Sequence, residues 1–113
     1  MTGASWVTQA DRARWQRQAA RELAAILGAW GDLPLIMWAA GPAGGLAGSV
    51  TGPAPAGDVR MVFTAWQRAL AMDEVTETGV AGGTWLRARA WRGGVRVTVT
   101  ATVPAGRGPA VTW

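Results

Sequence analysis

Two alternating segments joined by the pair Gly93-Gly94 constrain the fold of this 113-residue chain more than any other feature. In residues 84–92 and 95–103, small or apolar residues alternate with polar, charged or aromatic ones. That period of two is typical of a β-strand with one buried face. A two-residue Gly-Gly loop between two such runs is a strong hairpin signal. The sequence therefore predicts an antiparallel hairpin that turns at Gly93-Gly94.

The predicted turn also sets the register of this hairpin, because it pairs Arg92 with Val95. One face then carries only small or apolar side chains: Leu86, Ala88, Ala90, Val95, Val97, Val99, Ala101 and Val103. The other face carries Trp85, Arg87, Arg89, Trp91, Arg96, Thr98, Thr100 and Thr102. We predict that the first face belongs to the core and that the second is the outer face of the sheet.

Residues 8–30 have the period of an amphipathic helix, with apolar residues recurring on one side. Thr8 is expected to cap this helix in a capping box with Asp11, and Gly31 to end it in the left-handed conformation. A basic stripe lies nearly opposite the apolar side and consists of Arg14, Arg17 and Arg21. Residues 58–72 show the same period and predict a second helix, capped by Asp58.

Residues 33–57 contain no charged residue, but prolines and glycines interrupt the apolar run after residue 40. A membrane span needs about 20 continuous, predominantly apolar residues, so we expect no membrane contact here. The better prediction is a hairpin with strands at 33–40 and 46–51 and a glycine-rich turn between them. Because both alternating sets of the first strand are apolar, we expect it to be covered on both faces or central in the sheet.

A short alternating stretch at 74–78, followed by a glycine-rich turn, completes the pattern. The element order α-ββ-α-βββ predicts a single α+β domain over residues 1–113. We expect a two-layer sandwich in which two helices pack on one face of an antiparallel sheet. Residues 104–113 are rich in proline and glycine, and we predict either a loose tail or one that docks through its terminal indole.

Histidine and cysteine are absent, which excludes zinc sites, Ser-His-Asp triads and Cys-His dyads. The glycines of 41–48 lack the spacing of phosphate-binding or dinucleotide-binding loops, and Asp73, Glu74 and Glu77 lack the calcium-loop pattern. The sequence therefore predicts a protein that is not an enzyme, with no catalytic residue, metal, cofactor or small-molecule substrate. No signal peptide is expected either, because the first apolar positions are isolated, so the predicted location is cytoplasmic.

The outer face of the hairpin is the candidate binding site, with Trp85, Arg87, Arg89, Trp91 and Arg96 as its partner-binding residues. Three interpretations are open. The face is ordinary surface, with indoles stacked on arginines whose charge the nearby glutamates balance. It is a protein interface, since Trp and Arg are enriched at hot spots. Or it is a nucleic-acid platform, in which bases stack on the indoles and arginines neutralise phosphates.

We favour a non-catalytic binding module whose partner is protein, either another chain or a second copy in a homo-oligomer. In the ordinary-surface interpretation the balancing carboxylates are those of Glu74 and Glu77. The alternative function is nucleic-acid binding through the same face, with added contacts from Arg14, Arg17 and Arg21. The formal charge of +4 is only a mild hint of such binding, because the arginine-only usage fits a GC-rich coding sequence.

Several apolar segments carry a resemblance to known proteins, among them Leu33-Pro-Leu-Ile-Met-Trp38, Val62-Phe-Thr-Ala-Trp66 and Gly94-Val-Arg-Val-Thr-Val-Thr-Ala101. Together with Gly82-Gly-Thr-Trp-Leu-Arg87 they resemble a group of small, uncharacterised α+β proteins of streptomycete-type actinobacteria. The likeness spans most of residues 15–103, and its motifs belong to the fold. It implies a common origin and no particular activity.

Overall fold

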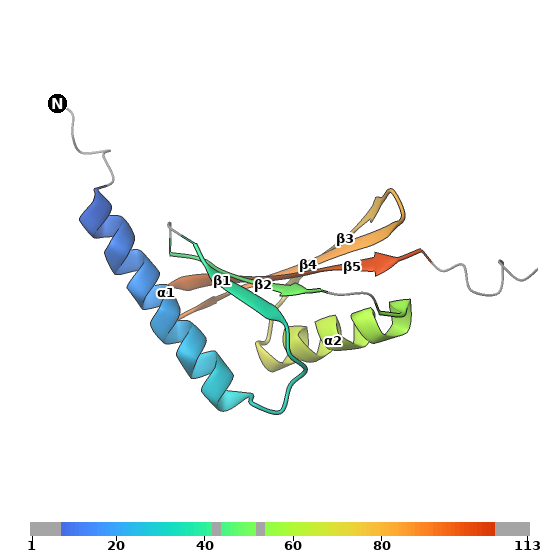
Figure 1. Cartoon of the computed structure of the whole chain (residues 1–113), viewed down its shortest axis with the longest axis horizontal. Helices are drawn as coiled ribbons and strands as arrows, with labels where there is room; N and C mark the ends of the chain where they lie inside the picture. The colour runs from blue at the N-terminus through green and yellow to red at the C-terminus, as the bar shows by residue number, and fades with distance from the viewer. Residues whose placement is uncertain (1–7, 42–43, 52–53, 106–113) are drawn as a thin grey trace, which may run out of the picture.

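The computed structural model describes residues 8–41, 44–51 and 54–105 (Figure 1). Along the chain it contains α1 (Gln9–Ala29), β1 (Met37–Ala40), β2 (Leu46–Val50), α2 (Ala56–Ala69), β3 (Glu74–Val80), β4 (Gly83–Arg92) and β5 (Val95–Pro104). The α+β class and the order of these elements are therefore confirmed. Of the predicted tail, Pro104 ends β5 and Ala105 donates its backbone N–H to the carbonyl oxygen of Gly82. Residues 106–113 lie outside the described residues.

The five strands form one sheet in the order β1-β2-β5-β4-β3. The predicted all-antiparallel sheet is wrong, because β2 runs parallel to β5, with Leu46 opposite Val97 and Val50 opposite Ala101. A parallel pair needs a long crossover connection, and the chain between these strands supplies one that contains α2, β3 and β4. The sheet is therefore mixed, and the pairing of β2 with β5 joins the two hairpins.

The hairpin of β4 and β5 has the predicted register, with Arg92 opposite Val95 and the further pairs following in step. Gly93 and Gly94 have φ angles of +57° and +79°, as a type I′ turn requires and as glycine allows without strain. The face predicted to be core is almost entirely buried, namely Leu86, Ala88, Val95, Val97, Val99, Ala101 and Val103, while Ala90 is half-buried. The two-residue turn therefore predicted both the pairing and the buried face.

The strand β1 lies at an edge of the sheet, not at its centre, and it begins at Met37 rather than at residue 33. Leu35 is 96% exposed and Met37 64% exposed. The central place beside β2 is taken by β5, so the prediction of a doubly covered strand is wrong. Only one side of β1 is covered, where the ring of Trp38 packs edge-on against that of Trp66 at 5.5 Å between centroids.

Gly48 of β2 lies directly opposite Trp38 and is buried beneath it. A Cβ atom at this position would lie 2.8 Å from Cδ1 of Ile36 and 3.0 Å from the Trp38 ring. The absent side chain therefore lets the indole of Trp38 lie close to the sheet and reach Trp66.

The two helix starts differ from each other. Thr8 caps α1 as predicted: its hydroxyl oxygen accepts a hydrogen bond from the Asp11 backbone N–H at 3.0 Å, and Asp11 completes the capping box. The helix ends at the C-cap Trp30, with φ of −126°, so the prediction of a left-handed Gly31 is wrong. The second helix starts two residues earlier than predicted, because Pro55 precedes its first turn and Asp58 lies within that turn.

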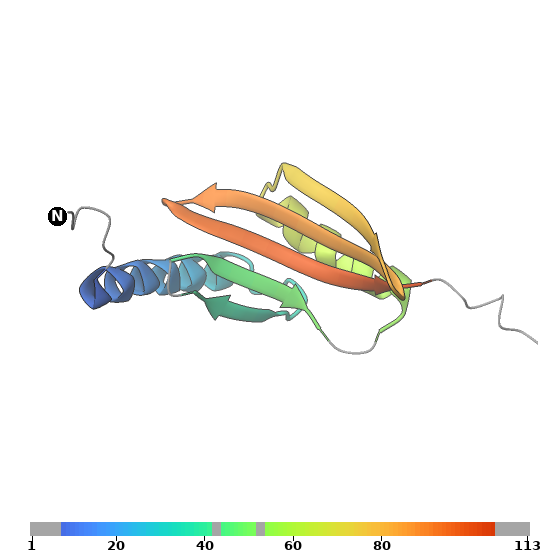
Figure 2. The same cartoon turned by 90° about the horizontal axis from the view of Figure 1, so that it is seen from above.

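Both helices contact the same face of the sheet, the one that carries the buried valines of β5 (Figure 1, Figure 2). From α2 the buried side chains are Val59, Phe63 and Trp66, and the indole N–H of Trp66 donates to the carbonyl oxygen of Pro34 at 2.7 Å. From α1 they are Ala19 and Ile26. The predicted two-layer arrangement is present in part: α2 covers the centre of the sheet, whereas α1 crosses one end of it (Figure 2).

Candidate binding face

The outer face of the sheet is the side that neither helix covers (Figure 2). Strand pairing places on it one alternating set of residues from each strand. From β4 and β5 these are Trp85, Arg87, Arg89, Trp91, Arg96, Thr98, Thr100 and Thr102. From the other strands they are Met37, Ala39, Ala47, Ser49, Glu74, Thr76, Thr78 and Val80. All five predicted partner-binding residues therefore share this face.

Trp91 and Arg96 form a cross-strand pair beside the Gly93-Gly94 turn. The guanidinium carbon of Arg96 lies 4.8 Å from the centroid of the Trp91 ring, within the range of a cation–π contact. The indole is nevertheless 64% exposed. Such a contact is worth roughly 0.5–1 kcal/mol at an exposed site, enough to orient the guanidinium without burying either group.

A second pair lies at the other end of β4. The guanidinium carbon of Arg87 is 5.4 Å from the centroid of the Trp85 ring, and Trp85 is half-buried. Trp85 and Trp91 are six residues apart on one strand, which corresponds to about 20 Å at 3.3 Å per residue. The outer face therefore has two separate indole–guanidinium pairs rather than one aromatic cluster.

The charge balance predicted for this face is half right. Arg89 pairs with Glu74 on the neighbouring strand, with 2.8 Å between Nη2 and Oε1. Glu77 instead faces the helices, where its carboxylate lies 3.3 Å from Arg60 of α2, because its position alternates with that of Glu74 along β3. Among the described residues, Arg87 has no carboxylate within 4.0 Å, and the same holds for Arg96. The outer face therefore keeps a net positive charge.

The basic stripe of α1 is not brought to the outer face. Its three arginines lie on the side of α1 opposite to Ala19 and Ile26, which contact the sheet, and all three are exposed. The first of them, Arg14, forms an ion pair of 2.7 Å with Asp11. The pKa of Asp11 is lowered from its ordinary value, first by the backbone N–H and hydroxyl of Thr8 and then by Arg14. The stripe and the outer face are therefore two separate basic surfaces.

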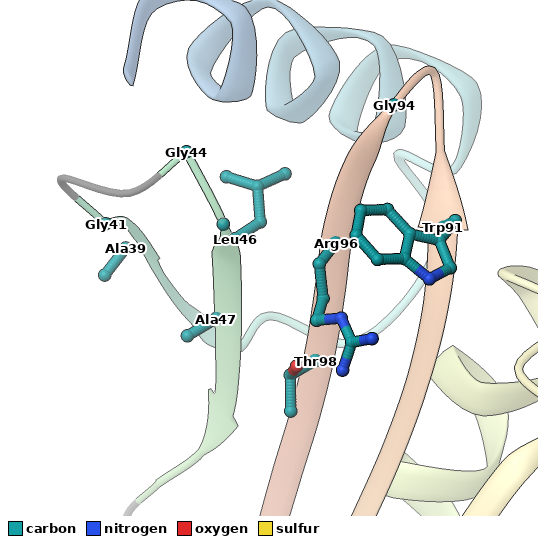
Figure 3. Close-up of a pocket in the computed structure, with 10 residues that line it drawn as sticks. Ala39, Gly41, Gly44, Leu46, Ala47, Trp91, Gly94, Arg96 and Thr98 are labelled. Carbon is teal, nitrogen blue, oxygen red and sulfur yellow. The ribbon is translucent and has the colours of Figure 1, made fainter. Parts of the chain in front are cut away.

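A groove of about 550 Å³ crosses the outer face at the end nearest α1 (Figure 3). Its lining residues come from β1, β2, β4, β5 and their turns: Ala39, Gly41, Gly44, Gly45, Leu46, Ala47, Trp91, Gly94, Arg96 and Thr98. In Figure 3, Arg96 lies between the indole of Trp91 and strand β2, with Thr98 next to it along β5. Two of the predicted site residues therefore form one wall of a groove.

The sequence did not predict this groove, because residues 41–48 have the pattern of a turn and a returning strand only. The groove forms because β2 lies beside β5, which brings Ala47 opposite Thr98. A local signal was present in the small side chains of Ala39 and Ala47, which leave their part of the outer face low. That signal has no meaning without the parallel pairing.

The described residues contain no group of three or more acidic side chains placed to hold a metal ion. Within the same part of the chain, neither helix combines the length and the apolar character that a membrane crossing requires. Comparison with protein-family models, curated proteins and solved structures finds no match to this chain. The resemblance to streptomycete-type proteins therefore stays a prediction.

Proposed function

We propose that this protein is a non-catalytic binding module that docks a protein partner on the outer face of its sheet, and that it does so in the cytoplasm. The observation that carries this proposal is the asymmetry of the sheet. Both helices pack on one face, whereas the other presents two arginine-stacked tryptophans, Trp85 and Trp91, which neither α1 nor α2 covers.

The energetics of these two pairs support a protein partner. Hot spots of protein interfaces are enriched in tryptophan and arginine, and burial of an exposed indole such as Trp91 removes a large apolar area from water. Stacking already restricts the guanidinium groups of Arg87 and Arg96. Less side-chain entropy is therefore lost on binding, which favours association.

Nucleic-acid binding is the second candidate, and the observation in its favour is the lack of a carboxylate near Arg87 and Arg96 among the described residues. Two observations weigh against it. Each of the two indoles already has a guanidinium over its ring, where a base would stack. The stripe of α1 also lies on a separate surface, so one strand cannot run straight across both.

Size-exclusion chromatography with light scattering at micromolar concentration tests self-association first. A dimer that Trp85→Ala and Trp91→Ala dissociate supports the proposal with a second copy as the partner. If the protein is a monomer, a candidate partner chain is purified and titrated against the same variants. Met61→Ala is the matched control, because Met61 is also 64% exposed but lies on α2.

The proposal fails if Met61→Ala weakens association as much as the tryptophan variants do, or if neither tryptophan affects it. An oligonucleotide titration over a range of salt concentrations separates the second candidate. Phosphate neutralisation gives a log–log slope of about −0.7 to −0.9 per contact, whereas an apolar protein interface responds weakly.

A further inference from the structure

The groove on the outer face has the dimensions and the lining of a small-molecule site. Its volume of about 550 Å³ falls within the range of roughly 300–1,000 Å³ that such sites occupy. The two glycine-containing turns bound it at one end, and Trp15 and Gln18 of α1 lie against those turns. The groove is therefore bounded at the end nearest α1 and open along the rest of the outer face.

The lining is apolar on one side and aromatic on the other. Ala39 and Ala47 contribute only methyl groups, and the turn glycines contribute no side chain. Leu46 lines the groove with its backbone, since its side chain is buried on the other face of the sheet, opposite Val97. On the opposite side lies the 64% exposed indole of Trp91. A flat aromatic ring that replaces the Arg96 guanidinium beside the indole contacts the alanine methyl groups as well, and its stacking on Trp91 substitutes for the cation–π contact.

The charge of the lining indicates which charged group a bound ligand would carry. Arg96 is the one charged residue among those that line the groove. Within the described part of the chain its side chain forms neither a hydrogen bond nor an ion pair, and its guanidinium contacts the Trp91 ring. A guanidinium matches a carboxylate in two parallel N–H···O bonds. Because the groove is otherwise uncharged, one cation balances the single charge of a carboxylate but leaves one charge of a phosphate dianion unbalanced.

We propose that this groove binds a small planar aromatic molecule that carries one carboxylate. Its ring takes the place of the Arg96 guanidinium beside the Trp91 indole and lies against the alanines, and the displaced guanidinium pairs with the carboxylate. The hydroxyl of Thr98 and the indole N–H of Trp91 are the other polar side-chain groups of the lining. This inference goes beyond the proposed function, because a ligand of this kind needs no protein partner, and either one can fail while the other holds.

Naphthalene-2-carboxylate is a suitable probe, and naphthalene-2-carboxamide is its uncharged equivalent. Binding is followed through the indole N–H signals in ¹H–¹⁵N spectra, with the Trp91 signal assigned from the Trp91→Phe variant. We expect one site for the carboxylate, with the largest shift at Trp91. We also expect the carboxamide to bind about tenfold more weakly or worse, because it lacks the charge-assisted hydrogen bonds.

Substitutions of Arg96 and Ala47 test separately the contributions of charge and of groove shape to ligand binding. Arg96→Gln is expected to weaken carboxylate binding by about tenfold or more and to leave carboxamide binding unchanged. Arg87→Gln is the matched control, since Arg87 also stacks on an indole and has no described carboxylate partner, but it does not line the groove. Ala47→Phe fills the groove and is expected to abolish binding of both probes, with Ala39→Leu as a second filling variant if the first one unfolds.

Three results would overturn this proposal. One is a lack of naphthalene-2-carboxylate binding up to millimolar concentration. Another is equal affinity of wild type and Arg96→Gln for that probe. The third is a loss in Arg87→Gln as large as that in Arg96→Gln, which would mean a diffuse charge effect of the whole outer face.

Discussion

The two faces of β5 differ although their residues alternate along one strand. Val95, Val97 and Val99 are at most 2% exposed, because both helices pack over them. Their neighbours Arg96 and Thr98 lie on the outer face and line a groove. Along β5, residues that stabilise the core therefore alternate one by one with residues of the proposed binding face. A substitution on either face therefore has an effect that its neighbour does not share.

The largest expected effect comes from Val97→Asp, which places an unpaired carboxylate in the core. That costs several kcal/mol against a total stability of about 5–15 kcal/mol, so we expect the domain to unfold. Thr98→Asp is the control on the adjacent outer position and is expected to stay folded. Circular dichroism and a thermal melt measure both. A folded Val97→Asp protein would mean that the two faces are assigned the wrong way round.

The outer face gives the next effect. Trp85→Ala and Trp91→Ala are each expected to weaken association with a protein partner by about 2 kcal/mol or more. Their melting temperatures should change little, because the indoles lie outside the core. Arg87→Ala and Arg89→Ala should matter less, and mostly at low salt. Titration calorimetry with the partner checks this order, and a nucleic-acid site would instead make the arginine and tryptophan changes comparable.

A smaller effect is expected at Gly48, on the covered face of β2. Gly48→Ala would press a methyl group against the Trp38 ring and the end of Ile36. We expect a loss of about 1–2 kcal/mol in the free energy of unfolding, because the Ile36 methyl can move whereas the indole cannot easily do so. Gly57→Ala in α2 is the control with open space at its Cβ, and there alanine should be neutral or stabilising. Denaturant unfolding measures both; equal effects would contradict close packing at Gly48.

The smallest effect belongs to the ion pair of Glu74 and Arg89 on the outer face. Its side chains are 59% and 34% exposed, so solvent screens the attraction. A double-mutant cycle with Glu74→Gln and Arg89→Gln should give a coupling energy of about 0.5 kcal/mol that disappears in high salt. A coupling above about 2 kcal/mol would show that the outer face also contributes to stability.

The features that were predictable from sequence are the local ones. The hairpin at Gly93-Gly94 and the capping box at Thr8 depend on residues within a few positions of each other, so spacing alone identifies them. The predicted site residues also share the outer face, because alternation along β4 and β5 requires it.

The features that were missed depend on pairing between distant segments. The place of β1 at the edge follows from the insertion of β5 beside β2, which no local pattern in residues 33–40 encodes. The groove has the same origin, since Ala47 and Thr98 are neighbours only in the folded sheet. Glu77 was assigned to balance the outer face from its closeness in sequence to Glu74, although one residue of alternation places it toward the helices.

The central position of β5 has a consequence for how the chain folds during synthesis. In the sheet order β1-β2-β5-β4-β3, the central strand is also the last of the seven described elements to leave the ribosome. At about 5–20 residues per second, β2 waits roughly 3–11 seconds for its parallel partner. During that interval one edge of β2 is unpaired and α2 has no completed sheet to cover. Assembly therefore cannot proceed progressively from the N-terminus, and a nascent chain that stops before Val95 should be recognised by chaperones and proteases as unfolded.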